Sequence, residues 1–447
     1  MSPALDACPG VLTLHPARDG LVARIRLPGG YASAARWRAL AALSREFGDG
    51  CVDVTARGNV QLRGLRAADA EALAERTAAA GLMPSAQHDR ARNITASPLS
   101  GLGGRPALRS LVDALDAALL AGPEFAALPG RFLFALDDST GGASLAASDL
   151  GLSYAAGDPA SGRPDGGCFD LFVAGRHTGV RVPAAEAVAA VLAATRAALA
   201  AGVGDSVTRV AALADGGRSV AAAAGGALGA PATPDARLAL SPPAGGESTI
   251  MEGHSAGADS HDRYRFTAAD CGESVAIMKD GRAREAAGTG GVVVVTARLG
   301  RLTGEQIEVI AALVAPDEVV RVGVAGRLVI PLGAGPAVGR PAGASPAVGR
   351  PAGASPAEGE SAGMALARLA AAGLIVSADE PMGDVTACSG AACSRSLADV
   401  RAAAGPVPNY RKTHWAGCSR RCGCPPDAEP VVALDATRYR MPGEGGA

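Results

Sequence analysis

Residues 10 to 82 carry short strand patterns around a helical pattern, and together they outline a small α+β unit. Four segments have the alternation or the β-branched content that predicts strands: V-L-T-L-H at 11–15, L-V-A-R-I-R-L at 21–27, C-V-D-V-T at 51–55 and V-Q-L-R-G-L at 60–65. Apolar residues at helical spacing predict helices over 32–47 and 67–80. This strand–helix–strand order with a second helix is typical of a ferredoxin-like half-domain.

A second segment of similar order begins near residue 291. G-V-V-V-V-T at 291–296, V-V-R-V-G-V at 319–324 and R-L-V-I-P at 327–331 predict strands. A helix is predicted over 303–314, with Thr303 as its N-cap and Glu305 in its first turn. Two such half-domains predict an internal pseudo-repeat.

Between and after these half-domains the pattern predicts a further lobe and two low-complexity segments. R-F-L-F-A-L-D-D at 131–138 and F-D-L-F-V-A at 169–174 predict strands, and 184–202 predicts a helix. Residues 215–262 are rich in Ala, Gly, Pro and Ser and predict a linker. P-A-V-G-R-P-A-G-A-S occurs at 336–345 and again at 346–355, and its lack of large apolar side chains predicts a disordered tether.

The predicted boundaries divide the chain into six segments. In order they are a first ferredoxin-like half-domain at 1–82, a first α+β lobe at 83–214, a linker at 215–270, a second ferredoxin-like half-domain at 271–334, the repeat tether at 335–362 and a cysteine-bearing lobe at 363–447. A chain of 447 residues is long enough for two or three cores.

Charge and hydropathy exclude several classes of partner. The formal net charge is −2, which gives no support to nucleic-acid binding or to a polybasic membrane role. The Ala-rich segment 183–201 contains Glu186 and Arg196, so it predicts an amphipathic or buried helix and not a membrane span. The first residues lack the basic and apolar regions of a signal peptide, and we therefore predict a cytoplasmic protein.

The candidate chemistry is concentrated in five cysteines between 388 and 424. They include two close pairs, Cys388 with Cys393 and Cys418 with Cys422, whose four thiolates could hold one metal ion or a cubane iron–sulfur cluster. Zinc sites favour two intervening residues within a pair and often recruit histidine, whereas these pairs have four and three. The spacing favours a [4Fe–4S] cluster. Cys424 is either a structural thiol or shares the ligand role of Cys422.

An arginine-rich segment, T-A-R-G-N-V-Q-L-R-G at 55–64, gives a second candidate site. If it is one extended strand, five polar side chains share a face: Thr55, Arg57, Asn59, Gln61 and Arg63. Such a face could be the solvent side of a sheet. It could also form the wall of an anion-binding cavity, because the guanidinium fork pairs bidentately with carboxylates.

The order C-x-G-x-x-C followed by G-C-x-x-x-C resembles the cluster signature of the sirohaem-type sulfite and nitrite reductases. The resemblance implies an α+β, sulfite/nitrite reductase-like fold, with two ferredoxin-like half-domains plus lobes that bind the cluster and a tetrapyrrole. It implies that Cys422 bridges the cluster to the tetrapyrrole iron. The first pair has four intervening residues where that family has five, so the Cys388 loop must differ locally.

Three arginine motifs resemble the same family in order along the chain. They are T-x-R-x-x-x-Q at 55–61, R-N-I-T-A-S-P-L-S-G at 92–101 and L-P-G-R-F-L-F at 128–134. The resemblance implies that Arg57, Arg63, Arg92 and Arg131 hold a tetrapyrrole. Sulfite reductases have a second basic residue in the third motif, where this chain has Leu133. The missing cation argues against sulfite or nitrite as the substrate.

Taken together, the motifs most resemble the precorrin-3B synthase branch of this superfamily. That resemblance implies O2-dependent C20 hydroxylation and lactone formation on precorrin-3A in aerobic cobalamin biosynthesis, with NADH as co-substrate. It also implies a mononuclear non-haem iron, but the six scattered histidines show no ligand spacing. No dinucleotide fingerprint follows a clear strand. The sequence therefore does not distinguish direct electron donation by NADH from donation through an electron-donor protein.

Two other functions stay open from the sequence. A sirohaem-dependent assimilatory sulfite or nitrite reductase would keep a bound tetrapyrrole and reduce the anion. A metal-stabilised binding module without catalysis would use the cysteines for stability alone.

Overall fold

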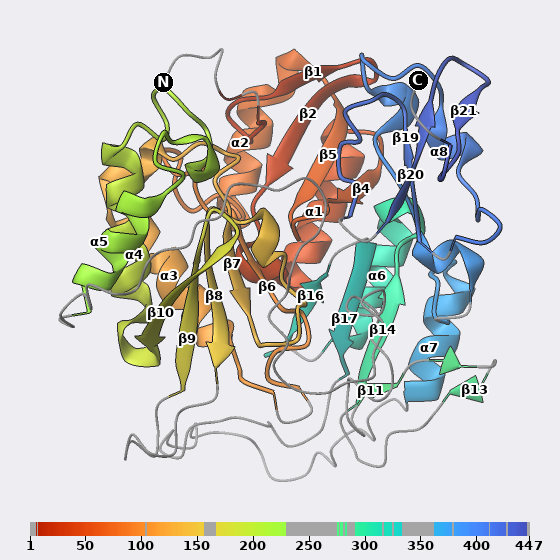
Figure 1. The fold of residues 1–447 in the computed structure, drawn as a ribbon. Helices are drawn as coiled ribbons and strands as arrows, with labels where there is room; N and C mark the ends of the chain where they lie inside the picture. The colour runs from red at the N-terminus through yellow and green to blue at the C-terminus, as the bar shows by residue number, and fades with distance from the viewer. Residues whose placement is uncertain are drawn as a thin grey trace, which may run out of the picture. The chain divides into compact units, whose positions relative to one another are not determined.

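The structure is a computed structural model that describes the chain in segments separated by gaps. The described residues are 6, 8–102, 105–155, 167–228, 275–276, 278–279, 282–283, 291–314, 317–323, 326–332, 362–377, 380–410, 412–425 and 428–444. They form two compact units. Unit 1 comprises Met1–Cys8, Asn93–Ser97 and Leu108–Arg265, and unit 2 comprises Pro9–Arg92, Pro98–Ala107 and Phe266–Ala447 (Figure 1).

The first half-domain, in unit 2, is built on a sheet of order β1-β2-β5-β4-β15. The helix α1 begins after Ser33, whose side chain accepts a hydrogen bond from the Arg36 amide and so caps the helix. Its elements are β1 (His15–Ala17), β2 (Gly20–Ile25), η1 (Pro28–Gly30), β3 (Tyr31–Ser33), α1 (Ala34–Phe47), β4 (Cys51–Val54), β5 (Val60–Leu65), η2 (Ala67–Asp69) and α2 (Ala70–Ala79).

The second half-domain repeats this order on a sheet of order β11-β14-β17-β16-β3. Thr303 is the N-cap of its helix in a full capping box with Gln306, and Glu305 lies in the first turn, which confirms the prediction for this helix. Its elements are β11 (Val275–Ala276), β14 (Val292–Thr296), η10 (Arg298–Gly300), β15 (Arg301–Thr303), α6 (Gly304–Leu313), β16 (Val319–Val322) and β17 (Arg327–Pro331); β12 (Met278–Lys279) and β13 (Arg282–Ala283) form a separate pair.

Each half-domain completes the sheet of the other. β15 pairs antiparallel with β4, with Arg301 opposite Asp53, and β3 pairs antiparallel with β16, with Tyr31 opposite Arg321. The predicted pseudo-repeat is therefore present, and it is joined by a reciprocal exchange of one strand.

Glycines at equivalent turns allow the two exchanged strands to cross. Gly30 has φ +75°, and a β-carbon at this position would lie 2.6 Å from the Val322 carbonyl oxygen. Gly300 has φ +71°, and a β-carbon at this position would lie 3.1 Å from the Val54 carbonyl oxygen. Only glycine combines the positive φ with this close approach of backbone to backbone.

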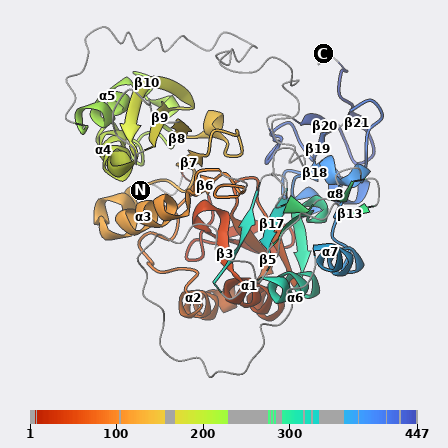
Figure 2. The same cartoon turned by 90° about the horizontal axis from the view of Figure 1, so that it is seen from below.

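A helical layer covers one face of both sheets. Figure 2 shows α2, α1, α6 and α7 (Ala362–Ala371) in a row. Trp37 and Leu40 of α1, Ile307 of α6, and Leu366 and Leu369 of α7 are buried in one core with the sheet residues. The helix α7, which the predicted boundaries place with the cysteines from residue 363, thus packs into the core of the half-domains.

The cysteine-bearing lobe, also in unit 2, has a sheet of order β18-β19-β20-β21. Its own core includes Val385, Val400, Trp415 and Val431. The lobe is tied to the second half-domain by the half-buried ion pair of Arg327 with Asp384 at 3.0 Å. Its elements are η12 (Pro381–Asp384), β18 (Val385–Ala387), η13 (Gly390–Ala392), α8 (Val400–Ala403), β19 (Thr413–Ala416), β20 (Glu429–Ala433) and β21 (Tyr439–Arg440).

Unit 1 is a sheet of order β10-β9-β8-β7-β6 with helices packed on it. Phe125, Phe132 and Phe134 are fully buried in it, and the carboxylate of Asp149 accepts from the backbone amides of Leu133 and Val210. Its elements are β6 (Ile94–Ala96), α3 (Arg109–Ala121), η3 (Pro123–Ala127), β7 (Phe134–Asp137), η4 (Leu145–Ala147), β8 (Leu150–Ala155), β9 (Cys168–Val173), β10 (Arg176–Pro183), η6 (Ala184–Glu186), α4 (Ala187–Ala200), η7 (Val210–Ala212) and α5 (Arg218–Gly226).

Three predictions about local structure need correction or fall outside the description. The strand predicted over 11–15 is wrong up to residue 14, since β1 begins at His15. Residues 218–226, predicted as the start of a linker over 215–270, form α5 because Val220, Ala221 and Ala224 make one buried helical face. The rest of that linker from 229, and the tether predicted over 335–362 up to residue 361, lie outside the described residues.

Helices long and apolar enough to cross a bilayer are absent from the described parts of the chain.

Candidate functional site

The two cysteine pairs follow adjacent parallel strands of the cysteine-bearing lobe. Cys388 comes directly after β18, and Cys418 follows β19 by two residues. β18 and β19 pair in parallel, with Ala387 opposite Trp415. Because the carboxyl ends of parallel strands meet at one edge of a sheet, the loops that carry Cys393 and Cys422 extend from the same edge.

Backbone amides already surround the Cys388 sulfur. It accepts hydrogen bonds from the Gly417 amide at 3.2 Å and from the Gly390 amide at 3.5 Å. Gly390 has φ +57°, and a β-carbon at Gly417 would collide with the Ser396 side chain. Glycine is therefore required at both positions for this approach to sulfur, and amide donors of this kind tune the potential of sulfur-bound clusters.

The four thiols lie close enough to influence one another. Burial raises the pKa of the Cys422 thiol, and the neighbouring charges of Cys418, Cys388 and Cys393 raise it further. Beside them, the His414 side chain is buried and its Nδ1 lies 2.9 Å from the Thr386 hydroxyl. Burial lowers the pKa of His414 to about 4, so the imidazole is neutral at pH 7.

The donor set fits an iron–sulfur cluster, because it offers four thiols and backbone amides that already point at one of the sulfurs. Among the described residues, no three His, Cys, Asp or Glu side chains converge closely enough to share one metal ion. In a cubane each thiolate binds its own iron, so the four sulfurs stand farther apart than they do around zinc. Cys388, Cys393, Cys418 and Cys422 would hold such a cluster. Cys424 instead has its sulfur 3.5 Å from the Pro425 carbonyl oxygen and 3.6 Å from that of Ala428.

The segment 55–64 is a hairpin turn followed by β5, and not the single extended strand that would place its five polar side chains on one face. Gly58 has φ +71°, which breaks the strand, and the Thr55 amide donates to the Asn59 carbonyl across the turn. The Thr55 hydroxyl accepts from the Asn59 amide, and Asn59 Oδ1 accepts from the Leu27 amide at 3.1 Å. Thr55 and Asn59 therefore shape the turn, and half-buried Arg57 lies at its tip.

Gln61 and Arg63 do share a face of β5, but both side chains are occupied by contacts within the protein. The Gln61 amide oxygen, in the orientation that satisfies both ends of the amide, accepts from the Arg24 guanidinium at 2.6 and 3.2 Å. The Arg63 guanidinium is bidentate to Asp19 at 2.9 and 3.0 Å. The Arg63 guanidinium is therefore engaged by residues of the protein itself.

The remaining arginines of the predicted set are distributed over both units. Arg92 is buried in unit 2, whereas Arg131 is exposed on unit 1. Leu133, which stands where the reductases have a second basic residue, is fully buried in unit 1.

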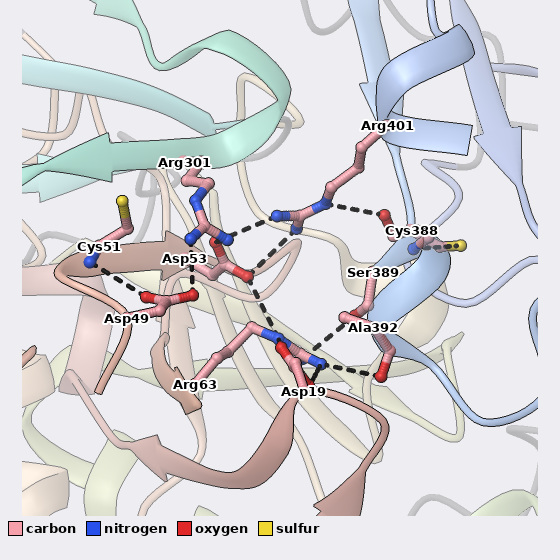
Figure 3. A network of polar contacts seen from close by, with 11 residues as sticks. Asp19, Asp49, Cys51, Asp53, Arg63, Arg301, Cys388, Ser389, Ala392 and Arg401 are labelled. Atoms are coloured by element: carbon pink, nitrogen blue, oxygen red, sulfur yellow. Dashed lines mark hydrogen bonds and ion pairs between the residues drawn. The ribbon is translucent and has the colours of Figure 1, made fainter. Parts of the chain in front are cut away.

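One residue beside the site was missed by the sequence reasoning. Arg401 donates to the Cys388 carbonyl oxygen at 3.1 Å and pairs with Asp53 (Figure 3). It lies eight residues after Cys393, and this closeness to the first cysteine pair was the available signal.

Comparisons with known proteins relate the chain to the nitrite and sulfite reductases. Residues 15–80 match the family model described as the nitrite/sulfite reductase ferredoxin-like half domain. A ferredoxin–nitrite reductase of Synechococcus elongatus is 34% identical over 170 residues, which cover 36% of this chain and 32% of that protein. A precorrin-3B synthase of a Sinorhizobium species is 41% identical over 69 residues, 15% of each chain. The matches thus span about a third or less of these relatives.

The fold has a counterpart among solved structures. The structure of the Mycobacterium tuberculosis NirA protein aligns with a TM-score of 0.61 and 18% identity, over 95% of this chain and 76% of that chain. The mixed α+β architecture is therefore of the sulfite/nitrite reductase type, as predicted.

Proposed function

Because the matches support membership of the nitrite/sulfite reductase superfamily, we propose that the chain is an oxidoreductase that holds a [4Fe–4S] cluster and acts on a tetrapyrrole. The observation that carries this proposal is the convergence of two cysteine pairs at the carboxyl ends of two adjacent parallel strands, β18 and β19. When bound, the cluster would supply single electrons. The protein contributes the amides at Cys388, which hold that sulfur in place, and arginines suited to ring carboxylates.

The finer proposal is a precorrin-3B synthase-like monooxygenase. It hydroxylates C20 of precorrin-3A and forms the lactone, so the substrate gains one oxygen atom. The second atom of O2 leaves as water, with two electrons supplied by NADH, directly or through a carrier protein. The 41% identity to a precorrin-3B synthase and the buried Leu133 at a position that is basic in the reductases support this choice.

A sirohaem-dependent nitrite or sulfite reductase is the second candidate. The match to a ferredoxin–nitrite reductase is longer, at 170 residues against 69, and supports it at least as well.

Anaerobic purification followed by an absorption spectrum and an iron and sulfide assay tests both candidates. About four iron and four sulfide per chain, with a broad shoulder and no sharp macrocycle bands, is expected of the monooxygenase. A Soret band that survives gel filtration would favour the reductase. Turnover of precorrin-3A with labelled O2, giving one labelled oxygen atom in the product, would separate the reactions directly.

An Arg57→Ala substitution is expected to weaken tetrapyrrole binding about tenfold, or about 1.4 kcal/mol, because it removes one charge-assisted fork to a ring carboxylate. The dissociation constant is measured by anaerobic absorbance titration, with the cluster spectrum as a check on the fold. Arg66→Ala is the matched control, since the Arg66 side chain is largely exposed and pairs with Asp69. Equal affinity of the Arg57→Ala and Arg66→Ala proteins would contradict the assignment.

A further inference from the structure

A network of three arginines and three aspartates lies between the first half-domain and the Cys388 loop. Figure 3 shows the Asp53 carboxylate at its centre. Asp53 lies on β4 and is buried, and three guanidinium groups from different elements surround it at 3.2 to 4.0 Å. They belong to Arg63 of β5, Arg301 of β15 and Arg401 of α8; Asp19 and Asp49 complete the network by pairing with Arg63 and Arg301.

Arg401 connects this network to a cluster ligand. Its Nη1 and Nη2 lie 3.3 and 3.2 Å from the two Asp53 oxygens, and its Nε donates to the Cys388 carbonyl oxygen at 3.1 Å. The Arg401 guanidinium group therefore binds Asp53 through its two Nη atoms and the Cys388 backbone through Nε. The backbone around Arg401 is also fixed, since the α8 N-cap Asp399 accepts from the Ala402 amide and Gly390 lies against the Arg401 amide.

A second anchor holds the other end of the same loop. Arg63, already bidentate to Asp19, reaches the Ser389 hydroxyl and the Ala392 carbonyl oxygen, each at 3.4 Å. The Arg18 amide donates to the same Ala392 carbonyl oxygen at 3.0 Å. The loop 388–393 is therefore held at its first residue by Arg401 and before its last residue by Arg63.

The network is balanced in charge, with three guanidinium groups against three carboxylates. Burial lowers the pKa of Arg301, but Asp53 and Asp49 more than offset this and raise it. Removal of one partner therefore leaves a buried charge uncompensated beside the cysteines.

We propose that Arg401 is a positioning residue for the cluster: it fixes the Cys388 backbone to Asp53 and keeps a positive charge beside the metal site. This inference rests on the proposed cluster. A nearby cation stabilises the reduced, more negative cluster and so raises its reduction potential. Asp53 acts on the same site with the opposite charge.

The test compares the loaded wild-type protein with Arg401→Gln, Asp53→Asn and Arg438→Gln. The last is the matched control, because exposed Arg438 pairs with Asp435 in the same lobe. Two quantities are measured: the midpoint potential of the cluster, and the rate of cluster loss to a chelator. Arg401→Gln is expected to lower the potential, and Asp53→Asn to raise it. Both are expected to speed cluster loss about tenfold, whereas Arg438→Gln changes neither quantity.

A merely structural contact would speed cluster loss without shifts of opposite sign, and that result would overturn the proposal. Arg401→Lys guards against misfolding of the glutamine variant. It keeps the charge but loses the fork, so the potential should stay near wild type while cluster loss quickens. A wild-type protein that takes up no cluster would overturn the proposed function as well. If the wild-type protein holds the cluster but has the same midpoint potential and the same rate of cluster loss as Arg401→Gln, this inference alone is overturned.

Discussion

A Cys418→Ser protein is expected to lose its iron–sulfur shoulder and to turn over at least about 100-fold more slowly. Changes next to metal ligands alone cost about 10–100-fold, and removal of a ligand should cost more. The fold should survive, because the core of the cysteine-bearing lobe is built from Val385, Val400 and Trp415, and Cys418 does not belong to that core. Iron and sulfide content, far-ultraviolet circular dichroism and turnover are measured on the same sample.

Cys424→Ser is the matched control for that experiment. The Cys424 sulfur contacts backbone carbonyl oxygens, which a serine hydroxyl can also reach, so the cluster and activity should stay within about twofold of wild type. Full activity of cluster-free Cys418→Ser would instead support a binding or structural role for the cysteines. Loss of iron in Cys424→Ser would show that Cys424 shares the ligand role.

A Gly30→Ala substitution is expected to lower the free energy of unfolding of the half-domains by about 3–5 kcal/mol. The added methyl group would meet the Val322 carbonyl oxygen at 2.6 Å and the Val322 amide nitrogen at 3.3 Å. Both atoms are backbone, so the pairing of β3 with β16 must shift to make room. In a Trp415→Phe background, Trp37 is the sole tryptophan, and its fluorescence in a urea titration follows this core.

Gly50→Ala separates the clash from the backbone conformation. Gly50 has φ +79°, close to the +75° of Gly30, but a β-carbon there would have no heavy atom within 4 Å. This control should cost only about 1–2 kcal/mol, the price of a left-handed alanine. Equal losses in the two variants would mean that the strand crossing tolerates the methyl group.

The fold could be predicted from the sequence where the information is local. Period-two alternation in 60–65 and helical spacing in 303–314 mark β5 and α6, and the Thr303 N-cap starts that helix where expected. The exchange of β3 and β15 could not be predicted, because pairing partners far apart in sequence leave no mark on the short patterns of either strand. The turn at Gly58 falls between the strands predicted over 51–55 and 60–65. The alternative of one extended strand over 55–64 arose because the polar residues on both sides keep an apparent period of two.

The site shows a similar limit. Cysteine spacing identified the four thiols as a candidate site, since ligand geometry is encoded in short motifs. The role of Arg63 depends on Asp19 in the turn between β1 and β2 and on Asp53 of β4, which meet it only in the folded sheet. Its side chain therefore looked available in the sequence although the fold occupies it.

Because each half-domain supplies one strand to the sheet of the other, the first sheet stays incomplete until the second half-domain has been synthesised. β4 is complete at residue 54, but its partner β15 ends roughly 250 residues later. At about 5–20 residues per second, the edge of β4 therefore stays unpaired on the ribosome for roughly 10–50 s. An open strand edge is a template for pairing with another chain. Aggregation of nascent protein should therefore start from the first half-domain. Two fragments split between the half-domains should regain native sheets only when they are refolded together.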